Sequence, residues 1–415
     1  MPLAAKPLAT EVHHRQTNGR RPCSTAPALP HIAQKAAGLL ALGVLALALD
    51  ACRSHDFPDY PANYREYAYV TNGASATVTV IDVVDVRVDR EIAVGQNPVA
   101  LAASPTRNEI YVVSAGAPGG NGSLAIIDAA RNAVAATVPL RRQPVSIDLD
   151  AAGSTAYIAS LGSNLVSVVD LKARREIAEI GAGEQPDAAR IAADGKTLVV
   201  SNRGGNSVSV IDPLTNRVRS VFPGCPGAGD PVILPDSSKA FIPCAAGHQV
   251  MVLALARNAN GASQPDRLLA LMDVGRAPVH IALKPDTGEL FVSNSLSNSV
   301  SEVITNTNDV SGAYLMGDTP VRGLVSADNS LLYVANLSSQ YVTVYSIDDG
   351  RRIGSMNVGD GPAAMAFSSN GLLLFVVDSR SGDVAVVRTA SRSLFTLMPV
   401  GRGPNAIVDK SFTVQ

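Results

Sequence analysis

The sequence predicts an all-β protein in which eight four-stranded antiparallel blades stack into a closed ring, and three observations lead to this fold class. A short motif recurs eight times, and a proline recurs eight times with the same period. The chain has 415 residues, 4% aromatic residues and no Trp. A composition rich in Val, Gly and small polar residues suits short strands that are joined by tight turns.

The first repeated feature is a four-residue strand motif that ends in Asn, Ser, Cys or Asp. Its copies follow one another at spacings of 42, 46, 42, 42, 50, 42 and 42 residues. Small polar residues at strand ends are turn formers, because their side chains bond neighbouring backbone amides. The eight copies start at Tyr69, Tyr111, Tyr157, Val199, Phe241, Phe291, Tyr333 and Phe375.

The repeated proline marks the start of each unit, where a missing backbone donor does little harm to a sheet. Within one period we expect four strands, covering in the first copies residues 99–103, the motif itself, residues 78–82 and residues 91–95. The eight prolines are Pro98, Pro144, Pro186, Pro231, Pro278, Pro320, Pro362 and Pro404. Two independent features with one period of about 42 residues establish the repeat.

Such a unit cannot bury both faces of its sheet alone, so the units must stack, and antiparallel units stack into a propeller. The first unit begins at its second strand near Tyr67, and the chain ends with a first strand at residues 404–409. We therefore expect the C-terminal strand to complete the N-terminal blade. The alternative of seven blades with a surplus unit would leave exposed strand edges, which propellers avoid.

The N-terminal segment is expected to direct export. An uncharged run at residues 36–49 follows Lys35, and its 14 residues suit a signal peptide but are too few to span a bilayer. It ends in Leu49-Asp50-Ala51-Cys52, which resembles a bacterial lipobox, with Asp50 as a departure. This resemblance implies lipidation of Cys52 and an outer-membrane lipoprotein, facing the periplasm or the cell surface. The alternative is an ordinary cleaved signal that ends at Ala51.

Residues 67–412 resemble the YVTN-repeat β-propeller family, through the motif at Tyr69 and strands such as Val166-Ser-Val-Val-Asp170. We expect a signal peptide at residues 1–51, a lipid-anchored linker at residues 52–66 and the propeller at residues 67–415. Family members are commonly seven-bladed, whereas this sequence holds eight units.

Two of the four cysteines are expected to form a disulfide. Strand alternation places Cys225, before a first strand, and Cys244, at the end of the next second strand, on the same face of the ring. An oxidising compartment favours such a bond. A redox or metal pair is the alternative, but CxxC spacing and neighbouring ligands are missing.

Four charged residues near the channel are not needed by the repeat. Small residues usually stand two positions after the proline, but His280 and Arg322 occupy that place, and Asp148 and Arg190 lie two positions further along. They either pair with one another and fill the channel, or His280 and Arg322 hold a small anionic ligand, with His248 in a nearby loop.

The leading functional hypothesis is a noncatalytic module that is anchored in the cell envelope and binds a protein, peptide or glycan. No HExxH, GxSxG or Walker motif is present, so no catalytic residue, metal or cofactor is assigned. One alternative is a lactonase-like hydrolase that uses His280, Arg322 and Asp148 at the channel mouth. Another is a propeller that binds a haem d1-like cofactor through His248 or His280. The formal net charge of −2 disfavours nucleic acid as a partner.

Overall fold

A computed structural model describes residues 58–414, except residues 257 and 260–261. The expected signal peptide and the lipidation site Cys52 lie outside these residues. Every regular element in the described part is a β-strand. Within that part no helix is long and apolar enough to cross a membrane.

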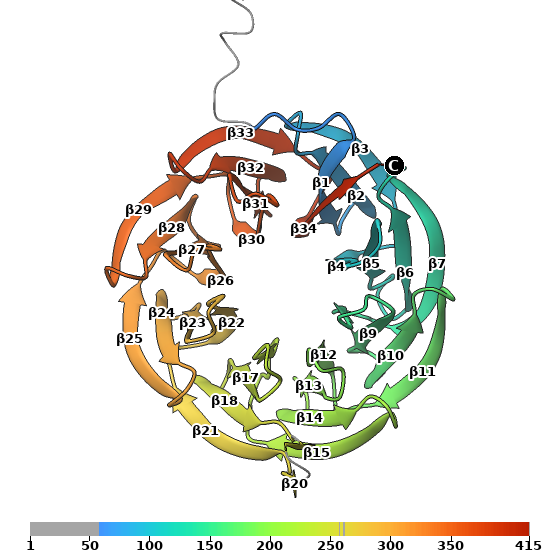
Figure 1. Ribbon diagram of the computed structural model, residues 1–415, viewed down its shortest axis with the longest axis vertical. Helices are drawn as coiled ribbons and strands as arrows, with labels where there is room; N and C mark the ends of the chain where they lie inside the picture. The colour runs from blue at the N-terminus through green and yellow to red at the C-terminus, as the bar shows by residue number, and fades with distance from the viewer. Residues whose placement is uncertain (1–57, 257, 260–261, 415) are drawn as a thin grey trace, which may run out of the picture. The chain divides into compact units, whose positions relative to one another are not determined.

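The strands form eight four-stranded antiparallel sheets, which we number as blades in chain order (Figure 1). A short hairpin, β19 (Asn258–Ala259) and β20 (Ala262–Ser263), adds a separate two-stranded sheet. From the innermost to the outermost strand the blades are as follows: blade 1, β34 (Pro404–Thr413), β1 (Tyr64–Asn72), β2 (Thr77–Asp82) and β3 (Arg87–Ala93); blade 2, β4 (Pro98–Ala103), β5 (Glu109–Ser114), β6 (Asn121–Asp128) and β7 (Ala133–Arg142); blade 3, β8 (Asp148–Leu149), β9 (Thr155–Ser160), β10 (Leu165–Asp170) and β11 (Arg175–Gly181); blade 4, β12 (Pro186–Ile191), β13 (Leu198–Asn202), β14 (Ser207–Asp212) and β15 (Arg217–Pro223); blade 5, β16 (Val232–Ile233), β17 (Lys239–Cys244), β18 (Gln249–Ala254) and β21 (Arg267–Asp273); blade 6, β22 (Pro278–Leu283), β23 (Glu289–Asn294), β24 (Ser299–Ile304) and β25 (Asp309–Leu315); blade 7, β26 (Pro320–Val325), β27 (Leu331–Asn336), β28 (Tyr341–Ser346) and β29 (Arg351–Asn357); blade 8, β30 (Pro362–Phe367), β31 (Leu373–Asp378), β32 (Asp383–Arg388) and β33 (Ser393–Pro399).

The two ends of the propeller meet in blade 1. Strand β34 pairs antiparallel with β1, with Tyr64 opposite Thr413 and Val70 opposite Ile407. Figure 1 shows β34, in red, beside the blue β1. The expected eight blades and the closure by the C-terminal strand are confirmed, and the seven-bladed alternative is not needed.

The second and third strands of each blade are buried on both faces, because neighbouring blades pack face to face. In β13 all five residues are buried, whereas five of the seven residues of the outermost strand β3 are exposed. The aromatic residues of the repeated motif, such as Tyr69, Phe291 and Phe375, are the largest side chains of these interfaces. Burying one such side chain contributes about 1.5–3 kcal/mol.

The polar residue that ends the motif connects three parts of the structure. In blade 7, Asn336 Nδ2 donates to Thr343 Oγ1 on the next strand at 2.9 Å, and its Oδ1 accepts from the amide of Gly317, which precedes the innermost strand, at 3.1 Å. A Cβ atom at Gly317 would lie 2.5 Å from Cγ of Asn336, so the turn requires glycine. The same contact occurs in blades 4 and 8, so in these three blades the motif holds the turn before the innermost strand.

The proline opens the innermost strand in six blades, but not in blades 3 and 5. Pro144 makes only an isolated bridge with Ser160, and β16 begins one residue after Pro231. In blade 5 the preceding loop pairs instead with the end of β17, through a bridge between Ala228 and Cys244. This loop takes the place of the first part of the innermost strand, so β16 has only two residues.

Candidate functional site in the central channel

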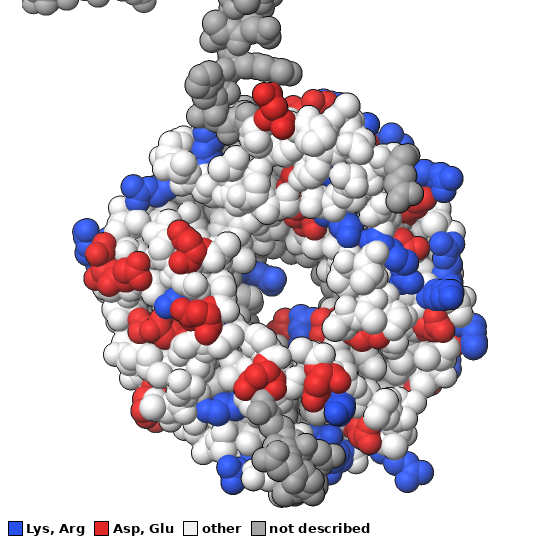
Figure 2. Space-filling view, in the orientation of Figure 1, with Lys and Arg blue, Asp and Glu red and all other residues white. Residues whose placement is uncertain are grey.

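The innermost strands surround a cavity of about 460 Å³ in the central channel. Figure 2 shows both acidic and basic side chains inside the opening of the ring. The charged residues of its lining are Asp148, Asp187, Arg190, Asp230 and Arg322, and small residues such as Ala100, Ala188 and Ala364 form much of the rest. The cavity is therefore polar and carries both signs of charge.

The shortest ion pair in this cavity joins Arg190 on β12 to Asp230 in the loop before β16. Arg190 Nε donates to Asp230 Oδ1 at 2.6 Å, and Nη2 donates to Oδ2 at 2.5 Å. Arg190 Nη1 also donates to the carbonyl oxygen of Ile147 at 2.9 Å. Burial opposes ionisation of Asp230, but Arg190 outweighs it and lowers the pKa of this carboxyl. Fork-shaped pairs of this kind fix both partners.

The loop that carries Asp230 is held by the expected disulfide. Cys225 and Cys244 are bonded, and both are fully buried. The amide of Gly229 donates to the carbonyl oxygen of Pro243 at 2.9 Å beside this bond. The prediction that strand direction brings the two cysteines together is confirmed.

Asp148 lies on the other side of Arg190, at the start of β8. Its Oδ2 accepts from the backbone amide of Ile191 at 2.9 Å, and its Oδ1 lies 3.9 Å from Arg190 Nη1. Burial raises the pKa of Asp148, although Arg190 opposes this shift. A carboxylate with a raised pKa is a better proton acceptor than an exposed one.

Arg322 on β26 is the cation without a partner in this cavity. Among the described residues, none makes a hydrogen bond or a close ion pair with its guanidinium, although Asp230 acts on it electrostatically. Arg322 is exposed on the channel surface, but the protein atoms that surround its guanidinium lower the pKa of Arg322, and an arginine keeps its charge under such shifts. Arg322 is therefore available to an anionic or carbonyl group that enters the channel.

His280 on β22 lies next to Arg322 in the ring but does not line the cavity. Its Nδ1 accepts from the backbone amide of Gly323 at 3.3 Å, which leaves the proton on Nε2. Burial and the nearby charge of Arg322 lower the pKa of His280 to about 3. The imidazole is neutral near pH 7, so it adds no charge beside Arg322.

His248 lies outside the cavity, in the turn between β17 and β18. Its side chain is exposed, and Nδ1 lies 3.2 Å from the amide of Ala277, which donates to it, at the start of the next blade. The structure thus brings Asp148 and Arg190 together and places Arg322 in the same cavity, with His280 behind it and His248 apart.

Two channel residues were not selected from the sequence. Asp230 lies in an irregular insertion that has no counterpart in the other repeats. Cys225 was the only residue of this insertion selected from the sequence. Asp187 directly follows Pro186, where the repeat pattern gives no hint of function; its Oδ1 lies 3.3 Å from Arg203 Nη1, and burial raises its pKa. In the described residues, no cluster of three or more His, Cys, Asp or Glu could hold a metal ion.

Comparisons with known proteins agree with the propeller fold. Residues 232–396 match the model of a family described as lactonase, 7-bladed β-propeller, and this segment contains His280 and Arg322. The sequence resemblance pointed to the YVTN-repeat family. That family and the lactonase family have the propeller fold in common. None of the curated proteins matches the chain.

Several solved structures resemble the chain at low sequence identity. AztD from Citrobacter koseri aligns with a TM-score of 0.64 and 14% identity, covering 85% of this chain and 99% of that one. The periplasmic gluconolactonase PpgL from Pseudomonas aeruginosa has a TM-score of 0.57 and 17% identity, with 83% and 99% covered. The dihydro-heme d1 dehydrogenase NirN has a TM-score of 0.65 and 13% identity, with 85% and 76% covered. At such identities the likeness concerns the fold alone.

Proposed function

We propose that this protein is a lactonase-like hydrolase that binds a sugar lactone in the central channel and opens its ring. The observation that carries the proposal is the unpartnered guanidinium of Arg322, in a cavity whose other arginine is fully engaged with Asp230. Arg322 also lies within the segment that matches the lactonase family model, which supports the same conclusion.

In the proposed reaction, Arg322 donates hydrogen bonds to the carbonyl oxygen of the lactone. This oxygen gains negative charge when water attacks the carbonyl carbon, and a positioned cation stabilises that charge. Asp148 accepts the proton of the attacking water, which its raised pKa favours. The bond between the carbonyl carbon and the ring oxygen then breaks, and the ring oxygen takes the proton from Asp148. The product is an open hydroxy acid, whose carboxylate pairs with Arg322 until it leaves.

The test is hydrolysis of D-glucono-1,5-lactone and D-galactono-1,4-lactone by the purified protein, followed by acid release in a pH-stat. We expect a rate well above spontaneous ring opening. Arg322→Ala should lower kcat/KM by about 10²–10³-fold, since it removes a donor to the developing oxyanion, and Asp148→Asn should lower kcat. Arg276→Ala, which changes an exposed arginine on the rim, is the matched control. Turnover no faster than the spontaneous rate, or equal in Arg322→Ala, would remove the proposal.

A noncatalytic binding module is the second candidate. It is favoured by the pairing of Arg190 with Asp230, since a cavity that fills itself with ion pairs leaves few groups for chemistry. It predicts that D-gluconate binds with an affinity that depends on Arg322, and that no lactone is turned over.

A haem d1-like cofactor does not fit the residues present. The two candidate axial ligands are His248 and His280, and neither lines the channel cavity. Three carboxylates of that cavity would also oppose an anionic macrocycle.

We also propose that the protein works in the cell envelope, anchored through Cys52. The apolar run at residues 36–49 supports export, and the buried disulfide suits an oxidising compartment. Metabolic labelling with a palmitate analogue should mark the wild-type chain and not Cys52→Ala. Equal labelling of the two would contradict the anchor.

A further inference from the structure

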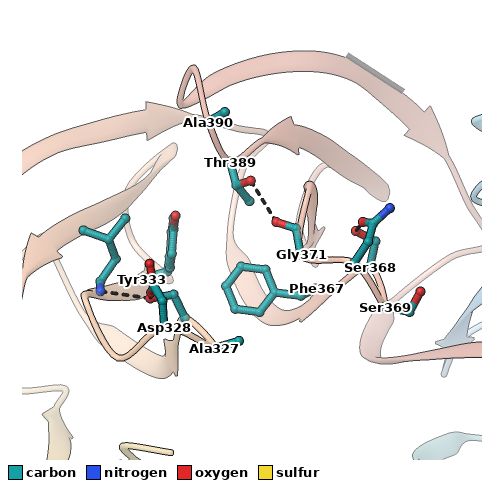
Figure 3. A pocket seen from close by; sticks show the side chains of 12 residues that line it. Ala327, Asp328, Tyr333, Phe367, Ser368, Ser369, Gly371, Thr389 and Ala390 are labelled. Carbon is teal, nitrogen blue, oxygen red and sulfur yellow. Dashed lines mark hydrogen bonds between the residues drawn. The ribbon is translucent and has the colours of Figure 1, made fainter. Parts of the chain in front are cut away.

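A second cavity, of about 540 Å³, lies between blades 7 and 8 and shares no lining residue with the channel cavity. Leu331, Tyr333 and Phe367 form its apolar wall, and Asp328, Ser369 and Thr389 stand among its polar residues. Figure 3 shows Phe367 between the turn that holds Asp328 and the turn that holds Ser369. The cavity has the size of a small-molecule site.

Tyr333 offers this cavity a hydroxyl group without a partner. The residue is only 2% exposed, yet no described residue makes a hydrogen bond with its hydroxyl. Among the equivalent tyrosines, Tyr69 donates to Asn132 Oδ1 at 2.6 Å and Tyr111 donates to Glu109 at 2.7 Å. Tyr157 of blade 3 resembles Tyr333, since no described residue makes a hydrogen bond with its hydroxyl. The hydroxyl of Tyr333 reaches the open cavity and is not sealed in the core, so a ligand there can bond it in place of water.

The residue that begins β27 is Leu331, and its side chain lines the cavity without crossing it. At the corresponding place in blade 5, Lys239 crosses to blade 6 and donates through Nζ to the carbonyl oxygen of Thr305 at 2.7 Å. Blade 2 is joined to blade 3 by Arg107, whose Nη2 donates to the carbonyl oxygen of Gly153 at 2.7 Å. Leu331 cannot make such a bridge, so the space in front of Tyr333 and Phe367 remains accessible.

The rim supplies a fixed acceptor. Asp328 Oδ1 accepts from the hydroxyls of Ser326 at 2.5 Å and Ser330 at 2.8 Å, and these bonds lower the pKa of Asp328. The other carboxylate oxygen has no partner among the described residues. Among the described residues of the lining, Asp328 alone is charged, so the site favours a polar ligand that donates hydrogen bonds to this carboxylate.

We propose that this groove binds a saccharide of one or two units, with the apolar face of a sugar ring against Phe367 and ring hydroxyls bonded to Asp328 and Tyr333. The rings of Tyr333 and Phe367 already meet edge to face, with centroids 5.4 Å apart, so the wall is preorganised. A polyol matches an apolar wall beside a free carboxylate oxygen and a free phenol, since its ring presents C–H groups on one face and hydroxyls at its edge.

The test is saturation-transfer NMR on the full-length protein with methyl glycosides of glucose, galactose and N-acetylglucosamine, and with benzylamine as a cationic probe. We expect at least one glycoside to bind with a Kd in the millimolar range. Asp328→Asn should weaken it about tenfold, and Tyr333→Phe about fivefold, as expected for the loss of a charged and a neutral hydrogen bond. Tyr333→Phe is compatible with the fold, because Phe291 and Phe375 occupy the same repeat position.

The equivalent residues of other blades serve as matched controls. Asp286→Asn changes the corresponding turn aspartate of blade 6, and Tyr157→Phe removes the corresponding hydroxyl of blade 3; both should leave the Kd within twofold. No glycoside binding, equal weakening in the controls, or tighter binding of benzylamine than of every glycoside would overturn the proposal. Arg322→Ala must leave glycoside binding unchanged. If this variant no longer bound the glycoside, the sugar would bind in the channel and not in the groove. Lactone hydrolysis is not a readout here, so the two proposals can fail separately.

Discussion

Blade 8 carries an acid where four other blades carry an amide, and this position yields a stability prediction. Asp378 takes the place of Asn336, and Asp383 stands on the next strand. Asp378 Oδ2 accepts from the amide of Gly359 at 2.9 Å, but one oxygen of each carboxyl lacks a donor. Burial, together with Asp383, raises the pKa of Asp378 to about 8. A proton on Asp378 would supply the missing donor.

The direction of this pH effect on stability depends on whether the folded or the unfolded state holds the proton of Asp378 more tightly. An unfolded Asp titrates near 3.9, so the folded state binds a proton that the unfolded state releases between about pH 4 and pH 8. Stability therefore falls as the pH rises through this window. At pH 7 the raised pKa of Asp378 lowers the free energy of unfolding by at most about 4 kcal/mol, since each pKa unit corresponds to about 1.4 kcal/mol. Asp378→Asn removes this cost, because the amide donates to Asp383 and still accepts from Gly359.

We expect Asp378→Asn to be about as stable as wild type at pH 4 and more stable by about 1–4 kcal/mol at pH 8. Thermal unfolding followed by circular dichroism at pH 4, 6 and 8 measures the difference, with the exposed Asp309→Asn as the matched control. A variant that gains the same stability at pH 4 as at pH 8, or that loses stability at pH 8, would refute the reasoning.

Three further predictions concern the ring closure, the disulfide and the repeated amide. Burial and Glu66 raise the pKa of Asp409 to about 8, so Asp409→Asn should lessen the loss of stability between pH 4 and 8; an unchanged pH profile in thermal unfolding would contradict this. Replacing Cys225 and Cys244 together by Ser should cost about 3 kcal/mol, and reductant should no longer shift Tm. Asn336→Ala should cost about 2–3 kcal/mol in chemical denaturation, because it strands buried partners, and a change below about 0.5 kcal/mol would argue against that role.

The parts of the fold that repeat could be predicted from the sequence. Eight copies of one motif fixed the blade number, and the unpaired strand at Pro404 indicated how the ring closes. The pairing of Cys225 with Cys244 followed from strand direction alone, since alternating strands return to the same face. Such inferences need only period and direction, which the sequence contains.

The chemistry of the sites depends on side chains that depart from the repeat, and there the sequence was less informative. Arg322 and His280 stood out because small residues fill their place in other blades. Asp230 did not, because it lies in an irregular loop whose path is set by a disulfide. The groove at Tyr333 was missed for the opposite reason: Tyr333 obeys the repeat, and no pattern in the sequence marks Leu331, which lines the cavity where Lys239 makes a bridge in blade 5.

The pairing of β34 with β1 also sets the order of events during synthesis. Strand β1 emerges early, yet its inner neighbour is translated only after all the other blades. Until then β1 in blade 1 has an unpaired edge, and the ring cannot close. A chain of this kind stays open until its last strands have emerged, which would suit the export that we propose. The same contact then joins the two ends of the propeller, so unfolding that begins at either end must first break it.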